Sequence, residues 1–67
     1  MASNDSVYSA RYIERQGRTV RENGGGSTTY LVGRHLYETD FDGDGTRIAI
    51  YVGPASIADF EAARGLR

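Results

Sequence analysis

The residues with the clearest chemical pattern are three aspartates at alternate positions, Asp40, Asp42 and Asp44, which stand beside two glycines in the stretch ETDFDGDGTRI. Carboxylates at positions 1, 3 and 5 with glycine at position 6 begin the calcium loop of an EF-hand. The second half of the pattern fails, because position 12 is Tyr51 where the loop needs a bidentate glutamate. We therefore predict a hairpin turn and no metal site, with weak association of a cation as the alternative.

No other group of residues forms a catalytic pattern. His35 is the single histidine and has no cysteine to activate, so we expect it on the core side of a strand end, partly buried and hydrogen-bonded. Glu38 and Asp40 are two positions apart on an exposed strand face, where a chain this small offers no cleft. The glycine-rich stretch NGGGST lacks the lysine of a phosphate-binding loop. We predict that the protein is not an enzyme and has no cofactor.

The composition limits the classes of protein to which the chain can belong. With 67 residues and no cysteine, it is predicted to be one domain, residues 1–67, that folds without disulfides around a small core. No apolar run approaches the roughly 20 residues that cross a bilayer, and the first residues lack the apolar segment of a secretory signal. We expect a cytoplasmic protein with no membrane partner.

The central part of the chain is predicted to form two paired strands. Residues 28–41 and 46–52 are rich in β-branched and aromatic side chains, and a two-residue turn at Gly43 and Asp44 would set Asp40 opposite Arg47. In this register one face holds the core residues Leu31, Tyr37, Phe41, Ile48, Ile50 and Val52. The other face holds the charged and remaining apolar residues Arg34, Glu38, Asp40, Arg47 and Tyr51 with Tyr30, Val32 and Leu36.

The C-terminal stretch GPASIADFEAARGLR predicts a helix. Pro54 suits a first turn, Ser56 and Asp59 have the spacing of a capping box, and Gly65 is placed to end the helix. Its apolar stripe, Ile57 and Phe60, is expected to cross the core face of the sheet.

Near the N-terminus, residues 7–22 favour a hairpin that turns at Gly17, and the competing prediction is a helix over residues 5–16 that is capped by Asn4 or Asp5 and ends at Gly17. The sequence leaves that choice open. The predicted class is α+β: a small antiparallel sheet of three to four strands with one C-terminal helix packed on one face.

Charge is distributed unevenly along the chain. Residues 1–36 carry a net charge of +2 and residues 37–67 a net charge of −3. An acidic patch beside tyrosines is typical of a surface that binds a basic partner. The residues predicted to bind such a partner, a larger protein or complex with a basic surface, are Tyr30, Leu36, Glu38, Asp40, Asp42, Asp44 and Tyr51.

Two other interpretations use different surfaces. Arginines interleaved with aromatic rings can hold single-stranded nucleic acid through phosphate contacts and stacking. The residues that would do so here are Arg11, Arg15, Arg18 and Arg21 with Tyr8 and Tyr12. The third interpretation is a homodimer that covers the apolar residues of the charged face, so the chain is expected to be a monomer or a homodimer.

In size, in its lack of catalytic residues and in its acidic patch beside tyrosines, the chain resembles the small inhibitors that phages and mobile elements encode, the anti-CRISPR proteins among them. The resemblance implies a stoichiometric inhibitor that mimics DNA and occupies the nucleic-acid or recruitment surface of a larger complex. Those families share no signature, so the resemblance assigns no residue a role.

Overall fold

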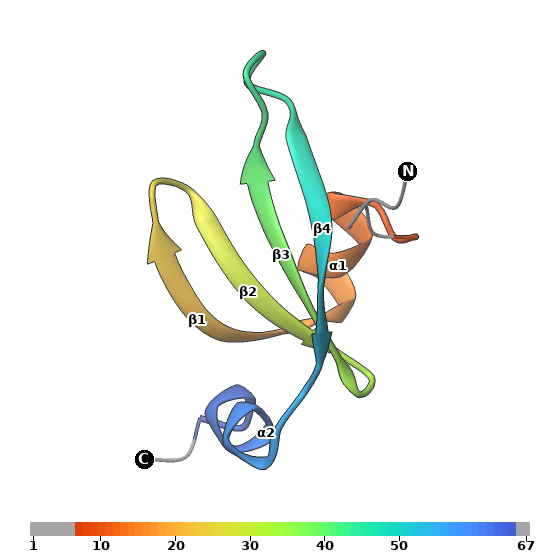
Figure 1. Cartoon of the computed structure of the whole chain (residues 1–67), viewed down its shortest axis with the longest axis vertical. Helices are drawn as coiled ribbons and strands as arrows, with labels where there is room; N and C mark the ends of the chain where they lie inside the picture. Colours follow the sequence, from red (N-terminus) through yellow and green to blue (C-terminus); the bar gives the residue numbers. More distant parts are fainter. Residues whose placement is uncertain (1–6, 66–67) are drawn as a thin grey trace.

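The computed structural model describes residues 7–65 and contains a four-stranded antiparallel sheet with helices at both ends of the chain (Figure 1). The elements are α1 (Ala10–Gln16), β1 (Arg18–Gly24), β2 (Ser27–Val32), β3 (His35–Phe41), β4 (Arg47–Pro54) and α2 (Ile57–Ala63). The strands pair in chain order, β1-β2-β3-β4. The predicted α+β class with a C-terminal helix is confirmed.

A helix, α1, replaces the hairpin that the N-terminal sequence favours. Ser9 caps it by accepting a hydrogen bond from the backbone N–H of Tyr12, and the helix ends at Gly17, as the competing helical prediction has it. The proposed caps Asn4 and Asp5 lie outside the described residues. The β preference of Ile13 was misleading because this side chain is fully buried, and burial of that size outweighs a small difference in propensity.

The stretch 28–41 is two strands rather than one. Gly33 and Arg34 form a two-residue loop between β2 and β3, with Val32 opposite His35. Gly33 has a φ of +63°, and glycine at the first loop position is typical of the tight turns that match the twist of a hairpin. The glycines of NGGGST likewise make the β1–β2 turn, although Asn23 and Gly24 still belong to β1 and Ser27 begins β2.

The register between β3 and β4 differs by one residue from the predicted one. The loop contains three residues, Gly43 to Gly45: the N–H of Gly45 donates to the carbonyl of Asp42 over 3.0 Å, and Gly45 has a φ of +81°. That is the common three-residue hairpin loop, whose last residue is left-handed. The predicted cross-strand pair of Asp40 and Arg47 is therefore wrong, because Asp40 lies opposite Ile48.

The extra loop residue also redistributes side chains between the two faces of the sheet. The face toward α1 is identified by the ion pair of Arg47 with Glu14 of α1, and by the ring contact of Tyr37 with Tyr8, which stacks on Tyr12 of α1. By strand alternation, this α1 face holds Tyr30, Val32, Tyr37, Thr39, Phe41, Arg47, Ala49 and Tyr51. The opposite α2 face holds Ser27, Thr29, Leu31, Leu36, Glu38, Asp40, Ile48 and Ile50.

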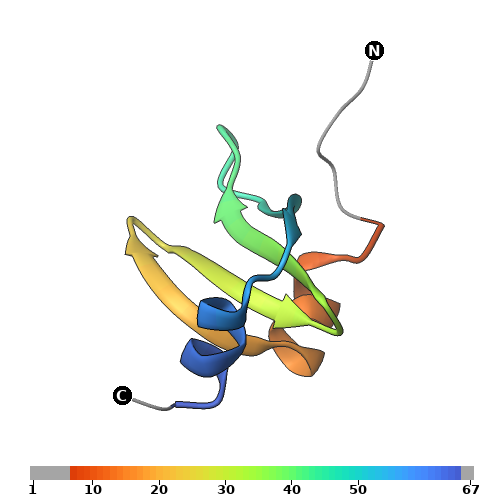
Figure 2. The ribbon, with the colours of Figure 1, turned by 60° about the horizontal axis from the view of Figure 1, so that its bottom comes forward.

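Helix α2 lies on the side of the sheet opposite α1 (Figure 2). The predicted capping box is confirmed, since Ser56 and Asp59 bond each other's backbone, and Gly65 follows the helix with a φ of +79°. Pro54, however, ends β4 instead of starting the helix. The predicted apolar stripe holds only in part: Phe60 is half-buried, but Ile57 is 78% exposed, and α2 contains no fully buried residue.

The core is small and lies on both faces. The buried residues are Ala10, Ile13, Ser27, Thr29, Leu31, Leu36, Tyr37 and Thr39. Phe41 and Val52, which were predicted to be in the core, are about half exposed, because Phe41 stands at the strand end and Val52 at the irregularity between β3 and β4. Within residues 7–65, neither helix is long and apolar enough to cross a membrane.

Candidate functional site

The β3–β4 hairpin extends beyond the rest of the sheet and carries the aspartates at its far end (Figure 1). One oxygen of Asp42, Oδ1, accepts hydrogen bonds from the N–H groups of Asp44 and Thr46, over 2.8 and 3.0 Å. The backbone N–H of Asp42 in turn donates to the carbonyl of Thr46. Asp42 thus organises the loop, which confirms the predicted turn.

The loop does not gather ligands for a metal ion. No group of three or more histidine, aspartate or glutamate side chains that could hold one occurs in residues 7–65. Asp40 uses its Oδ1 to accept the N–H of the next residue, Phe41, over 2.7 Å.

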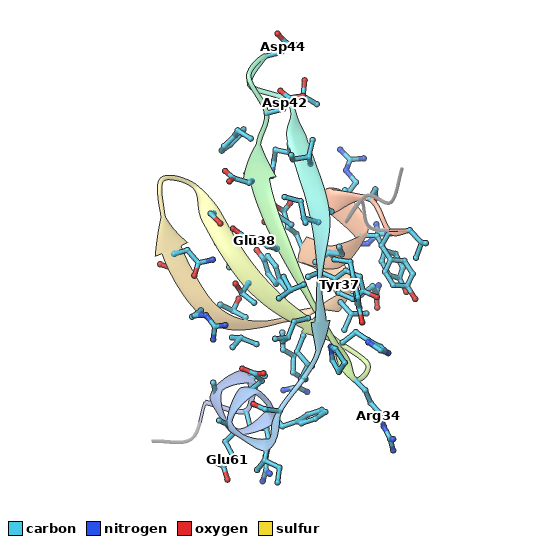
Figure 3. All side chains as sticks on the ribbon, in the orientation of Figure 1. Arg34, Tyr37, Glu38, Asp42, Asp44 and Glu61 are labelled. Atoms are coloured by element: carbon cyan, nitrogen blue, oxygen red, sulfur yellow. The ribbon has the colours of Figure 1, made fainter. Side chains whose placement is uncertain are left out.

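Four carboxylates run along this hairpin from the middle of β3 to the loop. Glu38 lies near the middle of the sheet, and Asp42 and Asp44 lie at its far end (Figure 3). We call Glu38, Asp40, Asp42 and Asp44 the acidic hairpin. Glu38 is half-buried and accepts a hydrogen bond from Ser27 over 2.5 Å, whereas Asp42 and Asp44 are exposed.

The acidic hairpin is not neutralised by the arginines around it. The ion pairs among the described residues join Arg21 to Asp59 and Arg47 to Glu14. Neither pair includes a carboxylate of the acidic hairpin. Arg47 is the cation nearest in sequence to the loop, and it is held by Glu14 and lies over the ring of Phe41 at 4.8 Å. The loop therefore presents uncompensated negative charge to solvent.

The residues predicted to bind a partner do not form one patch. Tyr30 and Tyr51 lie on the α1 face, while Leu36, Glu38 and Asp40 lie on the α2 face. Leu36 is only 5% exposed and is part of the core. The turn between β2 and β3 puts Tyr30 beside Tyr37, and the three-residue loop puts Tyr51 there too, so both tyrosines lie on the face away from Glu38 and Asp40. The four carboxylates still lie along one hairpin.

A row of rings on the α1 face was missed by the sequence reasoning. Tyr8 stacks on Tyr12 with ring centroids 4.6 Å apart and meets the edge of Tyr37 at 5.5 Å. The ring centroids of Tyr37 and Tyr51 are 5.5 Å apart, and the hydroxyl of Tyr51 is hydrogen-bonded to Nδ1 of His35 over 2.9 Å. The register of the three-residue loop would have revealed the pair of Tyr37 and Tyr51.

This row corrects the expectation for His35 and identifies a tyrosine with altered chemistry. His35 is exposed, not partly buried, although it is hydrogen-bonded as expected. Burial raises the pKa of Tyr37, and the neighbouring Tyr8 and Tyr51 raise it further. A tyrosine with a raised pKa stays neutral, which fits a packing role for this ring.

The arginines of the nucleic-acid interpretation are divided between two parts of the molecule. Arg11 and Arg15 are exposed on α1 and Arg18 is exposed at the start of β1. Arg21 lies instead on the α2 side, where its guanidinium is 3.7 Å from the carboxylate of Asp59. These four side chains therefore do not form one continuous basic surface.

No family model matches the chain, and neither the curated proteins nor the solved structures contain a similar one. The acidic hairpin is therefore the feature from which a function is inferred.

Proposed function

We propose that the protein is a non-enzymatic binding protein that places the acidic hairpin on a basic surface of a larger protein or complex. The observation that supports this proposal is the charge of the hairpin: its carboxylates lie outside both ion pairs of the described residues, and Asp42 and Asp44 stand at the end of the molecule that projects farthest (Figure 3). Clustered charge of one sign steers association with an oppositely charged surface and raises its rate.

The structure of the loop supports a docking role because the charge is held in a fixed shape. Asp42 anchors two backbone N–H groups, so the loop loses little conformational entropy when it binds. Phe41 is 46% exposed directly beside the loop and supplies an aromatic contact next to the carboxylates.

The inferred consequence of binding is inhibition. A basic surface that binds nucleic acid is one kind of partner that suits such a charge pattern, and a bound acidic hairpin would compete with the phosphates. An inhibitor of the anti-CRISPR kind, acting as a DNA mimic in the cytoplasm, is the specific form of this proposal, and its support is the resemblance in size and surface character.

The test uses two substitutions in the loop that leave the turn intact. Asp44→Arg reverses an exposed charge, and Asp42→Asn keeps the side-chain oxygen that accepts the N–H groups of Asp44 and Thr46. The matched control is Glu61→Arg, which makes the same charge reversal on α2 at the opposite end of the molecule (Figure 3). The immobilised protein is exposed to nuclease-treated bacterial lysate, and a retained protein is then purified for titration.

We expect the loop variant, which carries both Asp44→Arg and Asp42→Asn, to bind that protein at least about tenfold more weakly, or by about 1.4 kcal/mol. The Glu61→Arg variant should bind it nearly as wild type does. Equal binding by wild type and loop variant would contradict the proposal. Retained material that disappears with nuclease would instead favour nucleic-acid binding by Arg11 and Arg15 on α1.

A further inference from the structure

The two edges of the sheet are protected to different degrees. An exposed edge strand can pair with another chain, and proteins prevent this with charged residues, bulges or a covering helix. Strand β1 uses all three: it contains Arg18, Arg21 and Glu22, its pairing with β2 is interrupted by two register shifts, and α2 packs against it.

Strand β4 has much less of this protection along its middle. From Ile48 to Val52 it contains no charged residue, and it pairs with β3 without a register shift from Arg47 to Tyr51. The bulge and Pro54 come only after this stretch. Helix α1 contacts β4, but it also contacts β2 and β3, so it crosses one face of the sheet and leaves β4 as the outermost strand (Figures 1 and 2).

The hydrogen-bond pattern identifies which backbone groups of β4 face outward. The backbone N–H of Asp42 donates to the carbonyl of Thr46 at the end of the hairpin. Hydrogen-bonded and non-hydrogen-bonded pairs alternate along an antiparallel ladder, so Ile48 and Ile50 are the residues whose backbone groups bond β3. The N–H and C=O groups of Arg47, Ala49 and Tyr51 then point away from the sheet. Within residues 7–65, none of these groups is bonded to a loop, a cap or another element.

We propose that β4 pairs antiparallel with β4 of a second copy of the chain, about a two-fold axis at Ala49. In this register Ala49 lies opposite Ala49 of the second copy, and Arg47 lies opposite Tyr51. The outward N–H and C=O groups of each copy bond those of the other, and the two sheets become one continuous sheet. This arrangement is the homodimer that pairing of identical edges produces.

The side chains of β4 are complementary to themselves in this register. Ile48 of one copy lies opposite Ile50 of the other on the α2 face, where each is only partly buried in the single chain. Pairs of β-branched residues stabilise antiparallel strands. Arg47, the only charged residue of β4, faces Tyr51 rather than another charge. A second copy therefore fits this edge better than a strand that brings its own charges.

Neighbouring registers fit less well. With the two-fold axis moved to Ile48, Tyr51 would lie opposite Gly45 in the hairpin loop. With the axis moved to Ile50, Arg47 would lie opposite Gly53, where the strand is irregular and φ is +151°. The register centred at Ala49 keeps all pairing within the regular stretch.

The test measures the mass of the full chain by sedimentation equilibrium over a concentration series, together with amide hydrogen exchange at low and high concentration. We expect a species of twice 7.3 kDa at high concentration, with slower exchange at Ala49 and Tyr51 as it forms. A chain that stays monomeric to millimolar concentration would overturn the proposal. A dimer in which the exchange of these two amides is unchanged would overturn it equally, since another surface would then be paired.

Two variants test the edge in different ways. Ala49→Pro removes an outward N–H without removing a bond to β3, and Ile50→Lys places a charge opposite the apolar Ile48 of the second copy. We expect each to lower the association constant at least about tenfold. Val52→Lys is the matched control, because it lies in the same strand beyond the paired stretch and should leave the dimer intact. Circular dichroism confirms that each variant is folded.

If Ile50→Lys is folded and dimerises as wild type does, the edge is not the interface. The proposal does not depend on the acidic hairpin, because the dimer can be measured with no partner present.

Discussion

The two helices of this protein have the same length and the same kind of N-cap, yet they contribute differently to the fold. Each contains seven residues and begins after a serine whose hydroxyl accepts a backbone N–H. Helix α1 buries Ala10 and Ile13 against the sheet, whereas α2 buries no residue completely. A strong local signal for a helix and a large contribution to the core are therefore independent properties.

The largest expected difference comes from making the same substitution in both helices. Ile13→Ala removes a fully buried side chain and should cost about 2–5 kcal/mol, a large part of the about 3–10 kcal/mol expected for a chain of this length. Ile57→Ala in α2 truncates a side chain that is 78% exposed and should cost less than about 0.5 kcal/mol. Urea unfolding followed by circular dichroism measures both.

Similar losses in the two variants would mean that Ile57 packs against something in solution, and the contrast between the helices would not hold.

A smaller effect is expected from the cap of α2, and it should depend on pH. Hydrogen bonds from Ser56 lower the pKa of Asp59 below its ordinary value of 3.8, and the charge of Arg21 lowers it further. Because the pKa is lower in the folded state, the contribution to stability is present above the ordinary pKa and is lost as pH falls toward the lowered one. We expect Asp59→Asn to cost about 0.5–1 kcal/mol at neutral pH.

That cost should shrink progressively once the pH falls below 3.8, as the wild-type carboxyl becomes protonated. Urea midpoints of wild type and variant at neutral and acidic pH make the measurement. If the difference in urea midpoint between wild type and variant is the same at neutral and acidic pH, the capping hydrogen bonds, and not the charge of Asp59, stabilise α2.

The smallest effect concerns one proton on the α1 face. Because burial raises the pKa of Tyr37, its hydroxyl should ionise above the ordinary value of 10.0, and the stability that depends on the neutral form is lost as pH rises through the raised pKa. An absorbance titration of the phenolates should show a last step that Tyr37→Phe removes. Tyr12→Phe, at an exposed ring, should leave this step in place. Persistence of the step in Tyr37→Phe would assign it to another tyrosine.

Most of the elements could be predicted because their signals are local. The capping box of Ser56 and Asp59, the stop at Gly65 and the aspartate turn each depend on residues within a few positions of one another. The position of the acidic hairpin was predictable for the same reason, since its loop residues are held by bonds within the loop itself.

The faces on which β3 and β4 place their side chains could not be predicted together, because one glycine controls the register between these two strands. Gly45 adopts a left-handed conformation and lengthens the loop to three residues, and this moves Tyr51 next to Tyr37 and Ile48 opposite Asp40. A two-residue loop was equally compatible with the local sequence. The predicted partner surface therefore combined Tyr51 with acidic residues that lie on the other face.

The class of the fold, the helix α2 and the turn that carries the aspartates follow from local sequence, because each is specified by neighbouring residues. The tertiary structure alone decided that residues 10–16 form a helix and which face each strand presents. The physical reason is burial: Ile13 and Tyr37 are placed by contacts with residues distant in the sequence, and the free energy of those contacts exceeds the small local preferences that favoured a strand.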